Sequence, residues 1–340
     1  MTTAIVILNW NGENYLQQFL PILIEKTTFP DVEIIVADNA STDNSLKVMK
    51  AEFPTVRTIV LDKNYGFAEG YNQALAKVEA DYYVLLNSDV EVTTNWLQPL
   101  IEYMNVNENV AACQPKIRSY YQRTHFEHAG AAGGYIDYFG FPFSRGRIFG
   151  NVEEDKGLYD SIVDVFWASG ACLLVRSKLF WKVGGLDAEF FAHMEEIDLC
   201  WRLKSRAFRI VCIPESVVYH IGGGTLNSES PHKTYLNFRN NLLLLYKNLP
   251  SHQLRKVMFW RLFFDYAAAV QLFITGKPKN AWSIFKARKD YKRMQPRFED
   301  KRKENILYAT NDNQLNIFQK SIVLEYYLKG KRTFKELMKK

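Results

Sequence analysis

The sequence predicts an α/β protein: a Rossmann-like sheet flanked by helices, followed by a helical C-terminal extension. Over residues 4–116, short apolar runs alternate with amphipathic stretches, at the spacing of βαβ units in a parallel sheet. Polar residues follow each of the first four runs. Because the carboxyl ends of parallel strands share one edge of a sheet, these residues are expected where α/β proteins bind ligands. After residue 250 the alternation stops and basic charge accumulates.

The composition is that of an ordinary globular protein. The chain has 340 residues, of which 47% are hydrophobic and 24% charged, enough for one large domain or a domain with an appendage. Its four cysteines lack the paired spacing of metal sites, and the apolar run at 4–8 is too short for a signal peptide. We therefore expect a cytoplasmic protein with free thiols.

Charge is distributed unevenly along the chain. The net charge is +6, but residues 251–340 contain 21 basic and 8 acidic residues, a net of +13, so residues 1–250 have a net of −7. A basic C-terminal part suits an anionic partner: membrane lipid, a phosphate-bearing substrate or nucleic acid. Because no nucleic-acid-binding motif accompanies this charge, we expect no nucleic acid partner.

The first part of the chain predicts four strands and three helices. Strands are expected at 4–8, 32–37, 56–61 and 82–86, and helices at about 13–26, 41–53 and 64–78. Each strand is a short apolar run, and each helix begins at turn or capping residues. No GxGxxG follows the first strand and no GxxxxGK[ST] occurs, which argues against a dinucleotide dehydrogenase and a P-loop enzyme.

The fourth strand, at 82–86, leads into a polar triplet. Its five consecutive apolar or aromatic residues predict a strand covered on both faces, and Asn87-Ser88-Asp89 follows directly. A carboxylate at that edge of the sheet can hold a hard divalent cation, which would in turn bind a diphosphate. The alternative is that Asn87 and Asp89 only form a turn or cap the next helix.

Four ordered motifs resemble those of the family 2 glycosyltransferases, which have the GT-A fold. They are residues 5–11 (IVILNWN), 36–43 (VADNASTD), 64–72 (NYGFAEGYN) and 86–89 (LNSD). The subgroup most similar in appearance is the bacterial rhamnosyltransferase-like enzymes, and the resemblance covers about residues 3–248. It implies a GT-A domain over 1–250 with a mixed nucleotide-binding sheet. The break in the alternation at 117–160 predicts an insertion in this domain, and the change of composition after 250 predicts a basic helical extension over 251–340.

The resemblance also implies a reaction. The enzyme would transfer a sugar, with inversion, from a pyrimidine nucleoside diphosphate sugar (dTDP-rhamnose or a UDP-sugar). The acceptor would be a glycan or polyprenyl-linked glycan of cell-surface polysaccharide synthesis. One alternative is a nucleotidyltransferase that forms sugar nucleotides, but the loop after the first strand, at 9–13, lacks the basic residue such enzymes have. The other is a non-catalytic protein that binds sugar nucleotides or glycans.

The motifs assign the nucleotide site residue by residue. By resemblance, Asn9, Trp10 and Asp38 would contact the nucleoside, and the Asp38 carboxylate would accept a hydrogen bond from a base N–H. Asn64 and Gly66 would shape the nucleotide pocket. The alternative for Asp38 is helix or turn capping, and the alternative for Asn64 and Gly66 is an ordinary turn.

The metal site is assigned in the same way. The triplet occupies the DxD position of the family with Asn in its first place, so Asp89 would be the metal ligand, and Asn87 and Ser88 would face the nucleotide. His220, after the last predicted strand, resembles the second protein ligand. A carboxylate and a neutral imidazole suit Mn²⁺ or Mg²⁺, with diphosphate oxygens and water completing the shell. A lone His at a strand end is otherwise an ordinary surface residue.

The catalytic base is expected in the acidic run at 195–198. This run resembles the family's ED-x-D-L-x-x-R motif, and the base would be Glu196, where the family has Asp. Because Glu is one methylene longer, Glu195 remains an alternative. Asp198 and Arg202, four residues apart, are predicted to form a structural helix pair. Without the resemblance, the run would be interpreted as the solvated N-terminus of a helix.

The middle of the chain departs from the alternation. A helix at about 95–105 and a strand at 110–116 precede the insertion, whose ten aromatic residues would stack on sugars or form a satellite hydrophobic cluster. Further elements are predicted as strands at 166–176, 209–213 and 216–220, and a helix at 235–247.

The stretch 257–275 is long enough to span a membrane, but it carries Arg261 and Asp265. One interpretation is a helix in the membrane interface, flanked by the basic residues of 277–303, which would place the protein at the inner face of the plasma membrane. The other is a buried helix of the extension, with a dimer contact as one use.

Overall fold

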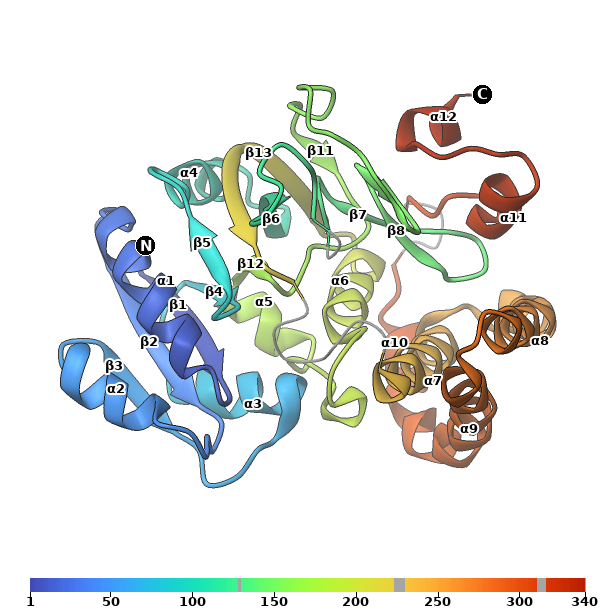
Figure 1. Cartoon of the computed structure of the whole chain (residues 1–340), viewed down its shortest axis with the longest axis horizontal. Coiled ribbons are helices and arrows are strands. Elements are labelled where there is room, and N and C mark those ends of the chain that lie inside the picture. The colour runs from blue at the N-terminus through green and yellow to red at the C-terminus, as the bar shows by residue number, and fades with distance from the viewer. Residues whose placement is uncertain (128–129, 223–229, 311–315, 340) are drawn as a thin grey trace.

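The computed structural model describes residues 1–127, 130–222, 230–310 and 316–339. The described strands form a nine-stranded sheet, in the order β11-β13-β6-β12-β4-β1-β2-β3 with β5 paired to β13, and a second sheet of four strands, β7 to β10. Figure 1 shows helices around the large sheet and the helices α8 and α9 at the opposite end of the molecule from α2.

The N-terminal part contains parallel strands joined by helices. β1 pairs with β2 and with β4, and β2 pairs with β3, all in parallel. These elements are β1 (Thr3–Asn9), α1 (Glu13–Lys26), β2 (Val32–Asp38), α2 (Ser45–Glu52), β3 (Arg57–Val60), α3 (Gly66–Leu75) and β4 (Tyr82–Leu86). Every residue of β4 is buried, as its apolar run predicts. The predicted βαβ alternation is confirmed.

The helix α2 begins later than the capping residues predict. Thr42 N donates a hydrogen bond to Asn11 Oδ1 at 2.7 Å, and Ser41 N donates to Asp38 Oδ1 at 2.9 Å. These bonds hold residues 41–43 in a loop against the turn after β1, so the helix starts only at Ser45.

The second half makes the sheet mixed, as the resemblance implied. β12 (Cys172–Arg176) runs antiparallel between β4 and β6 (Val110–Ser119), and β5 (Val90–Val92), which was not predicted, is antiparallel to β13. The two strands predicted at 209–213 and 216–220 are one strand, β13 (Arg209–His220). Its register with β6 shifts between Ile213 and Val217, beside Pro214, which has no N–H to donate to a ladder. The other elements here are α4 (Gln98–Val106), β11 (Val163–Asp164), α5 (Ser177–Lys182) and α6 (Glu195–Ser205).

The aromatic insertion forms the small antiparallel sheet. Its strands are β7 (Gly134–Ile136), β8 (Pro142–Ser144), β9 (Arg147–Ile148) and β10 (Asn151–Val152), and α11 (Ile322–Tyr327) and α12 (Phe334–Met338) pack on it. The ring of Tyr135 lies 4.9 Å from that of Phe334, and the ring of Phe143 lies 5.6 Å from that of Phe318. The satellite-cluster interpretation therefore holds for these rings.

The C-terminal helices continue the main core. They are α7 (Pro231–Asn248), α8 (Ser251–Ile274), α9 (Pro278–Met294) and α10 (Glu299–Leu307). The buried cluster on one face of the sheet includes Leu242 to Leu245 of α7 and also Val257, Tyr291 and Phe298. The domain boundary at 250 stays a prediction, and hydrophobic packing crosses it. In the described part of the chain, α8 alone has the length and apolarity of a membrane-crossing helix.

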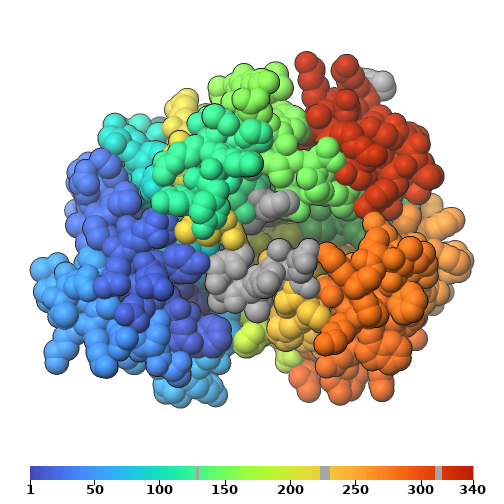
Figure 2. Space-filling view, in the orientation of Figure 1, coloured from blue at the N-terminus to red at the C-terminus, as the bar shows by residue number. Residues whose placement is uncertain are grey.

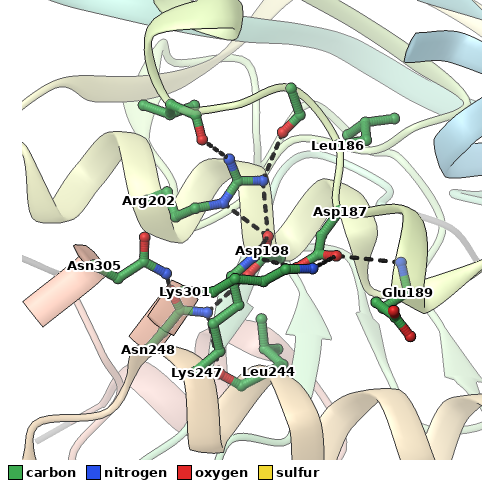
Figure 3. A network of polar contacts seen from close by, with 12 residues as sticks. Leu186, Asp187, Glu189, Asp198, Arg202, Leu244, Lys247, Asn248, Lys301 and Asn305 are labelled. Carbon is green, nitrogen blue, oxygen red and sulfur yellow. Dashed lines mark hydrogen bonds and ion pairs between the residues drawn. The ribbon is translucent and has the colours of Figure 1, made fainter. Parts of the chain in front are cut away.

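A buried polar network ties α6 to these helices (Figure 3). Asp198 accepts hydrogen bonds from Arg202 Nε and Lys247 Nζ, both at 2.8 Å, and from Asn248 Nδ2 at 2.8 Å. Asp187 accepts from Lys247 at 2.7 Å and from Lys301 of α10 at 2.6 Å. The predicted pair of Asp198 and Arg202 is confirmed as structural.

Candidate active site

Asp89 and His220 meet at the carboxyl ends of β4 and β13. Asp89 Oδ1 lies 3.1 Å from His220 Nε2, and both side chains are buried. The half-buried Asn87 lies with its Nδ2 3.5 Å from the same imidazole nitrogen. A backbone hydrogen bond holds the two strand ends together: Ile221, just after β13, donates its N–H to the backbone oxygen of Asp89 at 3.1 Å. The two predicted metal ligands are thus adjacent in space.

Asp89 and His220 each stabilise the ionised form of the other. Burial opposes ionisation of both groups, but the hydrogen bond and opposite charge of the partner outweigh it. The pKa of the Asp89 carboxyl is therefore lowered, and the pKa of His220 is raised to about 10, with Glu127 contributing to the latter.

Glu127 lies on the other side of the His220 ring. Its Oε2 is 3.3 Å from His220 Nδ1, an ion-pairing distance, although Nδ1 makes no well-aligned hydrogen bond among the described residues. A carboxylate at the far nitrogen orients an imidazole, as the outer partners of metal-bound histidines do. Sequence analysis missed Glu127, because a single Glu inside an irregular insertion carries no local signal.

Asn9 and Asp38 are buried together at the ends of β1 and β2. Asn9 Nδ2 donates to Asp38 Oδ2 at 3.2 Å. Asp38 is 1% exposed, and its Oδ1 also accepts a hydrogen bond from the backbone N–H of Ser41. Asn9 Oδ1 is buried and has no hydrogen-bond partner in the described part of the chain. Buried polar atoms without a partner are rare, which makes this strand end a candidate polar site. Trp10 is exposed and Ser88 half-buried at the same edge.

The turn before α3 is held by Asn39, which sequence analysis did not single out. Its Nδ2 donates to Asn64 Oδ1 at 3.1 Å and to the backbone oxygen of Gly66 at 3.0 Å, and its Oδ1 accepts from Tyr65 N at 3.0 Å. Its place beside Asp38, in a polar cluster at a strand end, was the available signal. Asn64 is itself exposed.

Gly66 supports the loop that leads into the acidic run. Its φ is +76°, and a Cβ there would lie 2.4 Å from the ring of Phe191. The backbone oxygen of Phe191 accepts from Phe67 N at 2.7 Å and Ala68 N at 3.1 Å. The loop is therefore docked on the first turn of α3, and the predicted role of Gly66 in a nucleotide pocket stays a prediction.

The same loop carries backbone strain. Phe191, His193 and Met194 have positive φ of 65°, 70° and 76°, which residues other than glycine rarely adopt. Asn240 of α7, fully buried, donates its side-chain amide to three backbone oxygens between residues 190 and 193, at 2.8 to 2.9 Å. Strain that surrounding contacts hold in place is typical of functional loops.

Glu195 and Glu196 follow this loop as the first residues of α6. Glu195 is 4% exposed, whereas Glu196 is half-buried, and each has one buried carboxylate oxygen without a partner among the described residues. Burial raises the pKa of Glu196 to about 7. Burial and the neighbouring Glu196 charge raise the pKa of Glu195 well above its usual range. Of the pair, Glu196 is the more exposed residue.

Two solved structures share the fold of this chain. TarS 1-349 of S. aureus in complex with UDP-GlcNAc aligns with a TM-score of 0.57 at 15% identity, covering 97% of this chain and 93% of that one. GalNAc-T7 with UDP, GalNAc and Mn²⁺ aligns with a TM-score of 0.58 at 15% identity, covering 88% of this chain and 56% of that one. The fold is thus of the GT-A type, as predicted.

The family follows from the sequence. The model of glycosyl transferase family 2 matches residues 4–184, and the chain belongs to this family. It is a nucleotide-sugar-dependent glycosyltransferase.

Two relatives have names that specify a sugar. The N-acetylglucosaminyl-diphospho-decaprenol L-rhamnosyltransferase of Mycobacterium tuberculosis is 28% identical over 231 residues, 64% of this chain and 75% of the relative. The rhamnosyltransferase WbbL of Escherichia coli K12 is 25% identical over 225 residues, 64% of this chain and 82% of the relative. The predicted resemblance to rhamnosyltransferases is confirmed.

Proposed function

We propose that the chain transfers a sugar, with inversion, from dTDP-rhamnose or another pyrimidine nucleoside diphosphate sugar to a glycan or polyprenyl-linked glycan acceptor. The names of the two bacterial relatives support rhamnose as the sugar, and the name of the mycobacterial relative supports a diphospho-polyprenol acceptor. The observation that carries the proposal is the contact of Asp89 and His220 at the carboxyl edge of the sheet. A polyprenyl-linked acceptor would place the reaction at the inner face of the plasma membrane.

Asp89 and His220 fit a divalent cation, Mn²⁺ or Mg²⁺. Their donor atoms are 3.1 Å apart. Because the pKa of His220 is about 10, its imidazole is protonated and donates to Asp89, so a cation would take the place of this proton and bind a neutral imidazole. The described residues contain no group of three or more His, Cys, Asp or Glu that could hold a metal. Two protein ligands leave the remaining positions for diphosphate oxygens and water, and the bound cation would neutralise the departing diphosphate.

Glu196 is the proposed base. The acceptor hydroxyl gives its proton to the Glu196 carboxylate while its oxygen bonds to the anomeric carbon. The bond from that carbon to the diphosphate breaks, and the nucleoside diphosphate leaves with the electron pair. We propose that the nucleotide is surrounded by the residues at the strand ends and the turn before α3: Asn9, Trp10, Asp38, Asn64, Gly66, Asn87 and Ser88.

A binding experiment tests the donor and the metal together. Thermal unfolding is measured with UDP-, dTDP- and GDP-sugars, each with and without Mn²⁺, for wild type and Asp89→Asn. We expect one pyrimidine nucleotide sugar to raise the melting temperature of wild type only with Mn²⁺, and Asp89→Asn to lose that dependence. Stabilisation that is the same without metal, or in the variant, would overturn the proposed metal site.

A second experiment tests the base. Glu196→Gln is expected to bind the donor like wild type but to lose turnover, because the amide cannot accept the proton. Glu195→Gln is the matched control from the adjacent position, and turnover that survives Glu196→Gln but not Glu195→Gln would assign the base to Glu195.

A further inference from the structure

We propose that the outer faces of α8 and α9 form a docking surface for a bilayer with anionic headgroups. This surface would bring the active site to a lipid-linked acceptor, so its use rests on the proposed function, whereas its existence is tested separately. Both helices form the edge of the molecule, in orange in Figures 1 and 2.

The polarity of α8 is reversed relative to an ordinary surface helix. Its buried side includes Arg261, at 1% exposure, and Asp265, at 0%. Arg261 pairs with Asp265 at 3.0 Å, and Asp265 also pairs with Arg288 of α9. A surface helix normally points its charges outward and its apolar stripe inward. Here the charges are satisfied inside, which leaves the outer side for another kind of contact.

The outer side of α8 is an aromatic and aliphatic stripe. It contains Phe259, Phe263, Tyr266, Val270 and Phe273, which recur at i, i+4, i+7, i+11 and i+14, the spacing of one helical face. All five are exposed, and Phe273 is 67% exposed. Single exposed apolar residues are common on protein surfaces, but a contiguous face of them marks an interaction site.

α9 extends the stripe and adds charge to it. The ring of Phe285 lies 5.2 Å from that of Tyr266 on α8, and Trp282 lies 5.7 Å from Phe285 and is 72% exposed. Lys286 and Lys289, both exposed, follow Trp282 at i+4 and i+7, so they share its face. Aromatic rings beside lysines suit the headgroup region of an anionic membrane.

The ion pairs exclude a helix that crosses the bilayer in this fold. Arg261 donates to the backbone oxygen of Phe139 at 3.2 Å and also contacts the side chain of Asn241 on α7. Pulling α8 into a bilayer would break these bonds and leave a buried charge in hydrocarbon. The helix therefore lies along the surface of the membrane.

The charges also argue against a second copy as the occupant. In a two-fold dimer the same patch meets itself, so the basic residues of one protomer would face those of its partner. The extension as a whole has a net charge of +13. An anionic lipid surface offers the complementary charge.

Vesicle flotation of the full chain tests the surface. The wild type is mixed with phosphatidylcholine vesicles with or without phosphatidylglycerol, at low and at high salt. We expect flotation with the anionic vesicles that weakens at high salt. F259Q/F263Q/F273Q should reduce vesicle binding at least about tenfold, since three aromatic side chains no longer enter the interface. K286Q/K289Q should reduce it about tenfold on anionic vesicles only.

The matched control removes exposed apolar residues elsewhere. V60Q/V106Q/L158Q changes three exposed aliphatic side chains outside the C-terminal helices and should float like wild type. Wild type that does not float, or a control that loses as much binding as F259Q/F263Q/F273Q, overturns the proposal. A wild-type dimer in light scattering that F259Q/F263Q/F273Q dissociates would overturn it in favour of a second copy. The increase in melting temperature caused by donor and metal is measured on the same samples. If the proposed function is wrong, this increase is absent even when the protein binds vesicles.

Discussion

Replacing Asp198 by Asn should destabilise the protein by about 3–5 kcal/mol. Asp198 is fully buried and accepts two charged hydrogen bonds, from Arg202 and Lys247, and a third bond from Asn248. The amide keeps the shape but removes the charge, so Arg202 loses its ion-pair partner among the described residues and Lys247 keeps only Asp187. The loss is large because a buried cation without its partner retains its desolvation penalty.

The effect should depend on pH in a defined direction. Burial acts to raise the pKa of Asp198, but the charges of Arg202 and Lys247 outweigh it and lower the pKa below its ordinary 3.8. A carboxyl whose pKa is lowered by folding stabilises the fold above its unfolded pKa, and the contribution disappears as pH falls through the folded value. The gap between wild type and Asp198→Asn should therefore be full at neutral pH and shrink in acid below about pH 4.

Urea unfolding followed by circular dichroism measures this difference. The matched control is Asp300→Asn, because Asp300 pairs with Lys303 at the surface with its side chain 96% exposed. Exposed pairs contribute about 0–1 kcal/mol, so the control should unfold almost like wild type. A loss below about 1 kcal/mol for Asp198→Asn, or an equal loss in the control, would refute the reasoning.

Three further predictions concern the site. Because Glu196 must be ionised to act as a base and its pKa is about 7, kcat/KM should fall about tenfold per pH unit below that value, and a flat profile from pH 5 to 8 would contradict this. Glu127→Gln should weaken Mn²⁺ binding about 10- to 100-fold in calorimetry with UDP present, because His220 loses the carboxylate that orients it; unchanged affinity would remove Glu127 from the site. Gly66→Ala should cost at least about 2 kcal/mol through its positive φ and its contact with Phe191, whereas Gly150→Ala, with open space around it, should cost little; equal melting temperatures would be the contrary result.

The regular part of the fold could be predicted because local pattern and burial agree there. The strand β4 is a continuous apolar run, and it is buried throughout. β5 could not be predicted, because three residues are too few for periodicity and the strand exists through its pairing with β13. β13 was divided in the prediction because Pro214 interrupts its pattern, whereas the fold absorbs the proline at a register shift.

The site residues that could be predicted are those that lie in family motifs. Asp89 and His220 are 131 residues apart, and their assignment came from family resemblance rather than from spacing. Glu127 and Asn240 act through contacts that only the tertiary structure makes. The reversed polarity of α8 was also beyond pattern analysis, because an apolar stripe is the same in the sequence whether it faces the core or the outside.

Asn240 offers a test of whether strain in the loop before α6 serves catalysis. Asn240→Ala removes the amide that holds three carbonyls of this loop, so the carboxylate of Glu196 should lose its alignment. A misplacement of about 1 Å can cost about 100-fold in rate, so we expect kcat to fall by 10- to 100-fold with donor affinity unchanged.

Asn241→Ala is the matched control for this test, because Asn241 is the next residue of α7 and is also buried, but its amide bonds to Gly140 and Arg261 and touches the loop only through the weak contact with Met194 Sδ at 3.9 Å. It should lose stability without losing kcat at a temperature where both variants are folded. If both variants lose kcat equally, stability explains the effect, and Asn240 has no separate role in positioning the base.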